Sequence, residues 1–411
     1  FFELTAFNLL FIHITSNCLM SDLSNLPNFT YINNIKQSII HAQHTKSKLE
    51  YAIKIIPKSN FITRPKEQQQ FKSTVNLLKQ LNFPLIACLY DCVEDENNYY
   101  LITEYASGGS LEEKLSNSHD QFEMSEISKF FTQIVSALTY LHHEKHIAHL
   151  NLNPSHILFD KSGNIKLIGF GKQQQITDTA SFLSSHNDLI FSSPEICSGR
   201  PFTSSSDIWA IGIILYRIIF NEYPFEDNDP AVLSSSIVNM SVIYPSLKEE
   251  ILIDLMKRLL QKDPSQRAPL DSLINHPFYQ KAFHINSETQ NDSIDRTILK
   301  KMQSMNIDLT TMHGDLLSHK TTDATAIYKQ LKLNQQLTLM KAASTSSLVE
   351  SSEDMTKQSI SHRNTIPKRK ASIAIRATKS RNCIFTAALS PSVSSENLLK
   401  SQPKKQKLDF Q

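Results

Sequence analysis

The chain has 411 residues, a net charge of only +2, and 8 glycines. That glycine share is far below the ~7% of average proteins, which excludes collagen-like and flexible-linker compositions. The first glycine is Gly108, so the first quarter of the chain cannot contain a glycine-rich phosphate-binding loop of the usual kind. The five cysteines form no C-x-x-C pair, which favours free thiols in a reducing compartment over disulfides or a zinc site.

Residues 1–27 form an N-terminal segment that we expect to lie outside the folded domain. Phe1–Ile14 is apolar, but polar residues interrupt it and it lacks a basic start, so it resembles neither a membrane span nor a good signal peptide. We expect the protein to start at Met20. No other stretch reaches ~18 consecutive apolar residues, so no membrane span is predicted.

Residues 28–105 alternate between short apolar and polar runs. Tyr51–Ile56 and Tyr99–Tyr105 are predicted strands. Phe71–Leu81 has apolar residues at helical spacing and is followed by Pro84, which predicts a helix that ends there.

From residue 107 to residue 280 the pattern becomes mainly helical. Phe130–His142 is amphipathic, and Ile208–Phe220 is apolar on nearly every face, as expected of a buried helix. Between them, Ile157–Asp160 and Ile165–Ile168 predict a β-hairpin.

The last part of the chain changes in composition. Residues 281–292 are polar and predict a linker, and residues 293–333 contain short helical patterns. Residues 343–411 are rich in Ser, Thr and Lys, with 12 Lys or Arg against 5 Asp or Glu, and predict a basic disordered tail.

Several short motifs lie in a characteristic order and spacing between residues 28 and 280. They are Tyr51-Ala52-Ile53-Lys54, Tyr100-Leu101-Ile102-Thr103-Glu104-Tyr105, His149-Leu150-Asn151-Leu152-Asn153-Pro154, Gly169-Phe170-Gly171, Ser193-Pro194-Glu195, Ser206-Asp207-Ile208-Trp209 and Arg267. Together they resemble a eukaryotic-type Ser/Thr protein kinase. The resemblance implies an α+β, bilobal fold with a β-rich N-lobe and a helical C-lobe.

The resemblance also implies a nucleotide pocket. Its positions are Lys54, Ile39, Ala52, Glu104, Ala106, Leu111 and Leu158. Lys54 matches the lysine that pairs with phosphate oxygens, although a lysine that only extends from its strand toward solvent is an open alternative.

The groups that hold phosphates in this family are replaced. The glycine positions of the phosphate loop align with Ile32, Asn34 and Gln37. The glutamate that orients the lysine aligns with Thr74, with Glu67 as a gap-shifted alternative. A hydroxyl cannot hold an ammonium group as a carboxylate does, so this ion pair is expected to be lost.

The catalytic loop differs even more. Asn151 stands at the position of the carboxylate that accepts the substrate proton, and an amide is not a useful base. Asn153 replaces the lysine that holds the γ-phosphate. His156 and Gly169 replace the two metal ligands, so Mg²⁺ binding is not expected, and ATP or another adenine nucleotide is expected to bind weakly at most.

Residues that support the fold are kept. They are the stacked spine residues Leu78, Leu89, His149 and Phe170, the spine anchor Asp207, and the ion pair Glu195–Arg267. Because structural positions persist while proton, phosphate and metal ligands change together, the sequence predicts a pseudokinase.

Within kinases, the Ser198-Gly199-Arg200 and Asn221–Phe225 turns are similar to the calmodulin-kinase-like group, near the AMP-activated and microtubule-affinity-regulating kinases. Residues 293–333 resemble the ubiquitin-associated-like domain that follows the kinase domain there. A helical extension of the C-lobe is the alternative, and Asn306 stands where that domain usually has glycine. Ubiquitin binding is not implied.

Three functions stay open. The first is an inactive scaffold or allosteric partner of other proteins, with an active kinase as one candidate partner. The second is a weakly active Ser/Thr kinase, and the third is an interaction module that works through its basic tail. The tail clusters Lys368–Lys370 and Lys404–Lys407 could contact anionic surfaces or direct nuclear import, so cytoplasm and nucleus are the expected locations. They carry no interleaved aromatic residues, so specific nucleic-acid binding is not predicted.

Overall fold

The computed structural model describes residues 26–117, 122–170, 174–175, 189–201, 203–245, 249–280, 283–284, 294–317 and 322–339. All of them fall within Phe1–Asp354, one of the two units into which the chain divides. The expected N-terminal segment up to residue 25, the tail 343–411 with its basic clusters, and most of the linker 281–292 lie outside the described residues.

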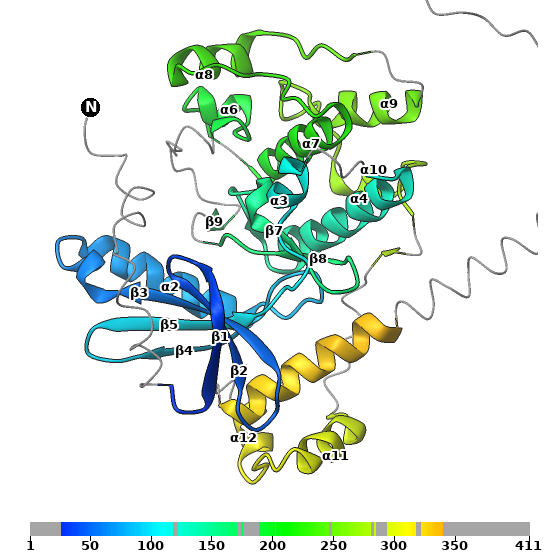
Figure 1. Ribbon diagram of the computed structural model, residues 1–411. Coiled ribbons are helices and arrows are strands. Elements are labelled where there is room, and N and C mark those ends of the chain that lie inside the picture. Colours follow the sequence, from blue (N-terminus) through cyan, green and yellow to red (C-terminus); the bar gives the residue numbers. More distant parts are fainter. Residues whose placement is uncertain are drawn as a thin grey trace, which may run out of the picture. The chain divides into compact units, whose positions relative to one another are not determined.

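A five-stranded antiparallel sheet forms the N-lobe, with strand order β1-β2-β3-β5-β4 (Figure 1). The strands are β1 (Phe29–Lys36), β2 (Ile39–His44), β3 (Glu50–Pro57), β4 (Leu89–Glu94) and β5 (Asn98–Glu104). A short 3₁₀ turn, η2 (Lys58–Phe61), leads from β3 into helix α2 (Pro65–Gln80). Both predicted strands are present, within one residue of their expected ends.

Helix α2 begins earlier than the apolar pattern predicted. The prediction placed its start at Phe71, but the helix begins at Pro65. Proline suits the first turn of a helix because its missing N–H would have had no partner there. The first turn is polar, so hydrophobic spacing could not reveal it.

The inner strand β5, which lies between β3 and β4, is buried on both faces. Tyr99 and Leu101 pack in a cluster with Val75 of α2, whereas Tyr100 and Ile102 belong to a second cluster on the other face. Alternate residues of a strand point to opposite faces, so the unbroken apolar run of this strand requires a cover on each side.

The C-lobe is mainly helical. Its elements are α3 (Leu111–Ser116), α4 (Met124–Thr139), η3 (Tyr140–Glu144), β6 (Ile147–Ala148), η4 (Pro154–His156), β7 (Ile157–Phe159), β8 (Ile165–Leu167), β9 (Gln174–Gln175), α6 (Pro194–Cys197), α7 (Ser205–Phe220), α8 (Pro230–Asn239), α9 (Glu250–Leu259) and α10 (Leu270–Leu273). The expected hairpin is formed by β7 and β8. The predicted buried helix is α7, and its residues from Ser206 to Tyr216 are all buried. The predicted amphipathic helix is α4, but it begins six residues before Phe130 and ends in a π-turn.

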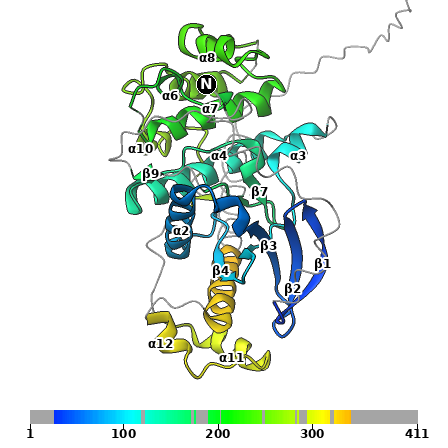
Figure 2. The same ribbon diagram turned by 90° about the vertical axis from the view of Figure 1, so that its left-hand side faces the viewer.

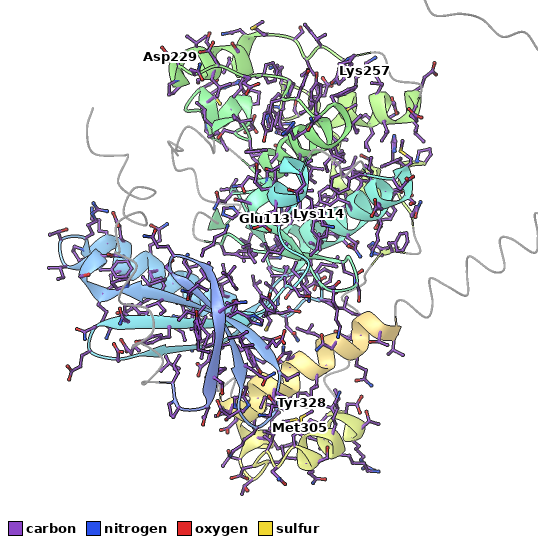
Figure 3. All side chains as sticks on the ribbon, viewed as in Figure 1. Glu113, Lys114, Asp229, Lys257, Met305 and Tyr328 are labelled. Atoms are coloured by element: carbon purple, nitrogen blue, oxygen red, sulfur yellow. The ribbon has the colours of Figure 1, made fainter. Side chains whose placement is uncertain are left out.

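Residues 294–317 and 322–339 form a small helical segment. It contains α11 (Arg296–Ser304), α12 (Met312–Leu317) and a helix over residues 323–339. Met305 and Tyr328 meet in its own hydrophobic cluster (Figure 3). Asn306 has a φ of +55°, in the left-handed region that glycine favours and asparagine tolerates best after it. The expected glycine is therefore replaced by the residue that fits the same backbone.

The helix 323–339 covers the face of the sheet opposite α2, where both views show it beside the strands (Figure 2). Ala326 and Leu333 join the cluster that contains Tyr100 and Ile102. Asp323 accepts a hydrogen bond of 2.7 Å from the side chain of Asn28. Among the described residues, no helix is both long enough and apolar enough to cross a membrane.

Candidate functional site

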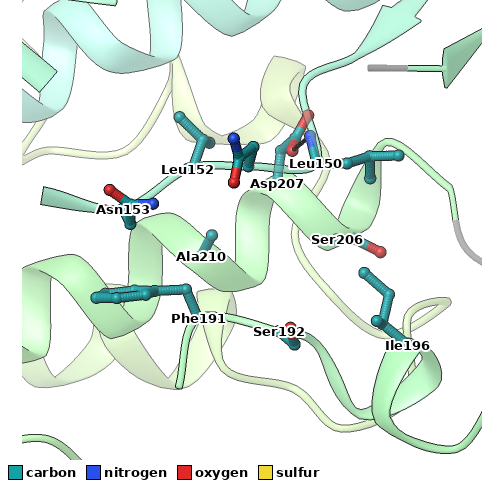
Figure 4. Close-up of a pocket in the computed structure, with 10 residues that line it drawn as sticks. Leu150, Leu152, Asn153, Phe191, Ser192, Ile196, Ser206, Asp207 and Ala210 are labelled. Carbon is teal, nitrogen blue, oxygen red and sulfur yellow. Dashed lines mark hydrogen bonds between the residues drawn. The ribbon is translucent and has the colours of Figure 1, made fainter. Parts of the chain in front are cut away.

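The start of the catalytic loop is held by one buried carboxylate. Asp207 on α7 accepts hydrogen bonds of 2.8 Å from the backbone N–H groups of His149 and Leu150, and it lies 2.8 Å from His142 Nε2. Burial would raise the pKa of Asp207, but the hydrogen bond from His142 and the other contacts outweigh it and lower the pKa. Asp207 therefore stays ionised and fixes the loop on the buried helix. Figure 4 shows Asp207 next to Leu150, in a small pocket that Asn153 and Phe191 also line.

Three hydrogen bonds join the catalytic loop to the segment that follows β8. The side-chain amide of Asn151 donates to the carbonyl of Gly169 (2.8 Å), and Nε2 of His149 donates to the carbonyl of Ile168 (3.0 Å). The backbone N–H of Ile168 donates to the carbonyl of His156 (2.9 Å). Burial lowers the pKa of His149 to about 4, consistent with a neutral ring. Asn151 thus acts as a structural donor at the position where the family has its proton acceptor.

His156 and Gly169 are sterically matched. A Cβ atom added to residue 169 would lie 2.4 Å from Cγ and 2.5 Å from Nδ1 of the His156 ring. Such distances are far shorter than a van der Waals contact, so a side chain at residue 169 would force the ring of His156 to shift. Gly169 also has a φ of +91°, which side-chain-bearing residues rarely adopt. The two replacements therefore depend on each other.

The imidazole of His156 is held in this position by its neighbours. Its Nδ1 lies 2.8 Å from the carbonyl oxygen of Asn151, which can only accept, so Nδ1 carries the proton of this bond. Oδ1 of Asn153 accepts hydrogen bonds from the backbone N–H of His156 at 3.1 Å and from Ser155 Oγ at 2.7 Å. Asn153 is committed to the loop itself.

A cavity of about 340 Å³ adjoins the catalytic loop and the sheet. The predicted pocket residues that line it are Lys54, Ile39, Ala52, Glu104, Ala106 and Leu158. His156 and Gly169 line its floor, together with Ile168 and Phe170. Leu111, also expected there, is fully buried in the C-lobe core instead. The structure thus gathers the candidate residues around one cavity, and nucleotide binding by them stays a prediction.

Lys54 lies on β3 and lines the cavity, and burial lowers its pKa. Thr74, the residue at the position of the orienting glutamate, is buried in α2 and donates to the carbonyl of Gln70 at 3.0 Å. Glu67, the gap-shifted alternative, forms an ion pair with Arg64 at 3.5 Å. Lys54 therefore matches the family's lysine. Thr74 forms its hydrogen bond within α2, and Glu67 pairs with Arg64 at the start of that helix.

The roof of the cavity is a strand rather than a flexible loop. β1 continues to Lys36 and pairs with β2 up to the partners Lys36 and Ile39, with two irregularities in the register. Ile35 and Lys36 line the cavity, and Ile32 and Ile35 are about 40% exposed. A side chain at each position prevents the close approach of backbone N–H groups that a glycine loop provides.

A buried ion pair that sequence inspection did not identify lies behind the cavity. Lys166 of β8 is fully buried, and its Nζ lies 2.6 Å from Oε1 of Glu104 at the end of β5. Removal of one partner from such a pair leaves an uncompensated buried charge. The pair therefore ties the last residue of the sheet to the C-lobe hairpin.

The predicted structural residues lie as expected. His149 and Phe170 are in edge-to-face contact with ring centroids 4.7 Å apart, and Leu78 and Phe170 pack against the same core cluster. Arg267 makes two hydrogen bonds with the carboxylate of Glu195, at 2.8 and 3.0 Å, and both side chains are buried. The spine is therefore assembled around a changed catalytic loop.

The residues present do not fit a magnesium–triphosphate group. Mg²⁺ prefers oxygen ligands, yet the family's ligand positions carry an imidazole and a hydrogen atom. The two carboxylates that line the cavity are engaged elsewhere, Glu104 with Lys166 and Glu113 with the backbone N–H of Ser110 at 2.9 Å. Among the described residues, no cluster of three or more His, Cys, Asp or Glu is placed to hold a metal ion.

The sequence prediction treated His156 and Gly169 as replaced metal ligands and did not include a contact between them. A signal did exist in the sequence, since both positions belong to the same metal site in the family and changed together. Their contact nevertheless depends on the left-handed backbone at residue 169, which the sequence pattern does not encode.

Comparison with known proteins identifies the family. The model named "Protein kinase domain" matches residues 37–279, more than half of the chain. The chain therefore belongs to the protein kinase family, which confirms the predicted bilobal α+β fold.

Individual relatives narrow the group. The chain is 29% identical over 241 residues to the human "SNF-related serine/threonine-protein kinase", covering 58% of this chain and 31% of that protein. It is 30% identical over 269 residues to "Probable serine/threonine-protein kinase MARK-A" of Dictyostelium discoideum, covering 63% and 25%. It is 26% identical over 324 residues to "SNF1-related protein kinase catalytic subunit alpha KIN12" of Arabidopsis thaliana, covering 74% and 64%. The chain spans about a third or less of the first two of these relatives and 64% of the third, and the matches agree with the predicted group.

Proposed function

We propose that this chain is a catalytically inactive kinase-fold protein that acts as a scaffold or allosteric partner of other proteins in Ser/Thr kinase signalling. The observation that carries the proposal is the contact between His156 and Gly169. The imidazole fills the space that a side chain at residue 169 would need, so the loss of the metal ligand is built into the packing.

The geometry of Asn151 supports the same proposal. Its side-chain amide is used as a donor to the carbonyl of Gly169, and an amide cannot take a proton from a substrate hydroxyl. Loss of a general base alone slows catalysis by about 10²–10⁴. Its combination with the lost metal ligands leaves a site that is ordered but lacks the groups for phosphate transfer.

An ordered fold without this chemistry suits a partner role. The spine contact between His149 and Phe170 and the ion pair Glu195–Arg267 are formed. The C-lobe surface can then bind another protein, an active kinase among the candidates, without turnover. The basic tail offers a further contact with anionic surfaces, and deletion of residues 343–411 measures how much partner binding depends on it.

The direct test is transfer of radiolabelled phosphate from ATP to a generic Ser/Thr substrate and to the chain itself. We expect no incorporation above that of Lys54→Ala, whose lysine lines the cavity. Incorporation that depends on Lys54 and grows with time would refute the proposal.

A weakly active kinase is the second candidate, and the retention of Lys54 in the cavity favours it. If it is correct, restoration of the lost groups should raise activity strongly. Because a side chain at residue 169 collides with His156, the restored variant must combine Asn151→Asp and Gly169→Asp with His156→Asn. The double variant Gly169→Asp/His156→Asn is the matched control. It keeps the repacked floor of the cavity but lacks the carboxylate at residue 151 that would act as the base.

A further inference from the structure

We propose that the packed pair of His156 and Gly169 excludes a metal–triphosphate group from the cavity, and that the cavity binds an uncharged, nucleoside-sized planar heterocycle without a metal ion. This inference rests on the proposed function, because it concerns the same cavity in a chain that does not transfer phosphate.

The size and walls of the cavity suit a flat apolar ring. Its volume of about 340 Å³ lies at the small end of the ~300–1,000 Å³ range of ligand pockets. Ile39 and Ala52 come from strands of the sheet, while Leu158 and Ile168 come from the C-lobe hairpin and the residue after it. Apolar side chains therefore approach from both lobes, as the two faces of a heterocycle require.

Several polar side chains of the lining are already hydrogen-bonded to backbone groups of the protein. Thr103 Oγ1 donates to the carbonyl of Ala52 at 3.0 Å. Ser110 and Glu113 form a reciprocal capping box at the start of α3, and Figure 3 labels Glu113 at this helix. These bonds hold the lining in shape before any ligand binds, and they leave little hydrogen-bonding capacity for a large polar group.

Charge argues against the triphosphate. The cationic side chains of the lining are Lys36, at the exposed end of β1, and Lys54, whose pKa burial lowers. A triphosphate carries several negative charges, and burial of charges without compensating partners is costly. In active kinases bound metal ions neutralise most of that charge.

His156 prevents that neutralisation here. Its ring lies where the side chain of residue 169 would extend, and its Nδ1–H is directed to the carbonyl of Asn151. The imidazole supplies no carboxylate oxygen for a metal ion at the floor of the cavity. It also occupies the space that a carboxylate side chain at residue 169 would need. The exclusion of the metal ion therefore follows from this packed pair of residues.

The test is titration calorimetry of the full chain with adenosine and with ATP, each with and without MgCl₂. We expect adenosine to bind about tenfold or more tightly than ATP, which corresponds to ~1.4 kcal/mol, and MgCl₂ to leave the ATP affinity unchanged within about twofold. In the double variant His156→Asn/Gly169→Asp, MgCl₂ should strengthen ATP binding by about tenfold.

A matched control is His143→Ala, which removes an imidazole that is 48% exposed and does not line the cavity. It should bind adenosine as the unmodified chain does. Circular dichroism of each variant verifies that it is folded. If the double variant does not fold, His156→Ala, which has a smaller side chain at the floor of the cavity, replaces it in the test. His156→Ala should bind adenosine at least as well but gain no response to MgCl₂.

Tighter binding of ATP than of adenosine, or a strengthening by MgCl₂ in the unmodified chain, overturns the inference. So does the absence of heat with both ligands. These outcomes are separate from the proposed function, because phosphate transfer is measured independently and an inactive chain that binds no ligand would still be a scaffold.

Discussion

Replacement of Gly169 by aspartate is expected to destabilise the fold, although it restores the residue of the family. The new Cβ atom would lie 2.4 Å from the ring of His156, and such overpacking costs ~1–3 kcal/mol. The φ of +91° adds backbone strain of ~1–3 kcal/mol for any residue with a side chain. We therefore expect Gly169→Asp to lower the free energy of unfolding by ~2–6 kcal/mol.

Two further variants separate the collision from the strain. Gly199 also has a positive φ, +63°, but a Cβ atom there would meet nothing within 4 Å, so Gly199→Asp should show strain alone, ~1–2 kcal/mol. His156→Asn in the Gly169→Asp background removes the ring and should recover the ~1–3 kcal/mol of overpacking.

Urea denaturation followed by circular dichroism gives the free energy of unfolding for each variant, and a double-mutant cycle gives the coupling between residues 156 and 169. We expect a coupling above ~1 kcal/mol for this pair and none between His156→Asn and Gly199→Asp. A coupling below ~0.5 kcal/mol would show that the two replacements are independent, and the steric argument would then be wrong.

The remaining predictions concern the fold around the site. Arg267→Ala should lower the free energy of unfolding by ~3–5 kcal/mol in urea, because it leaves Glu195 buried without its partner. The pKa of His149 is lowered to about 4 in the folded chain, so the unfolded chain takes up this proton at a higher pH than the folded chain does. The free energy of unfolding should therefore fall as the pH drops from ~6.5 toward 4, with a slope of up to ~1.4 kcal/mol per pH unit. The variant His149→Phe should lose this part of the slope. Leu333→Ala should cost ~2–5 kcal/mol, because the residue is 2% exposed and covers the sheet. Asn306→Val should lower the melting temperature through ~1–2 kcal/mol of left-handed strain, whereas Asn306→Gly should not lower it.

Each of these has a result that contradicts it. A loss below ~1 kcal/mol in Arg267→Ala would mean that water reaches the ion pair. An unchanged acid slope in His149→Phe would assign the proton uptake to another group. Leu339 is 64% exposed on the same helix, so an equal loss in Leu339→Ala would show a general effect on the helix rather than contact with the sheet. Equal melting temperatures for Asn306→Val and Asn306→Gly would remove the backbone explanation.

The sequence could predict which residues belong to the candidate site, but not the contacts between residues that are far apart in the chain. The spacing between Lys54, Asn151 and Gly169 was sufficient to align the chain with kinases, since each residue stands at a fixed distance from an apolar element. It could not show that Asn151 donates to Gly169, because that hydrogen bond joins a loop to a segment 18 residues later. Lys166 was missed for a similar reason, because a lysine within an apolar strand has no partner in its local sequence.

The sequence by itself determined the family and the order of the elements, and it predicts the loss of the catalytic groups, since these depend on residue identity and local spacing. Only the tertiary structure decided how the replacements fit together. Two examples are the ring of His156 against Gly169 and the helix 323–339 against Tyr100 and Ile102. The apolar run of β5 required a cover on each face, but hydrophobic burial is non-directional, so the pattern could not identify a helix more than 200 residues away as one of the two covers.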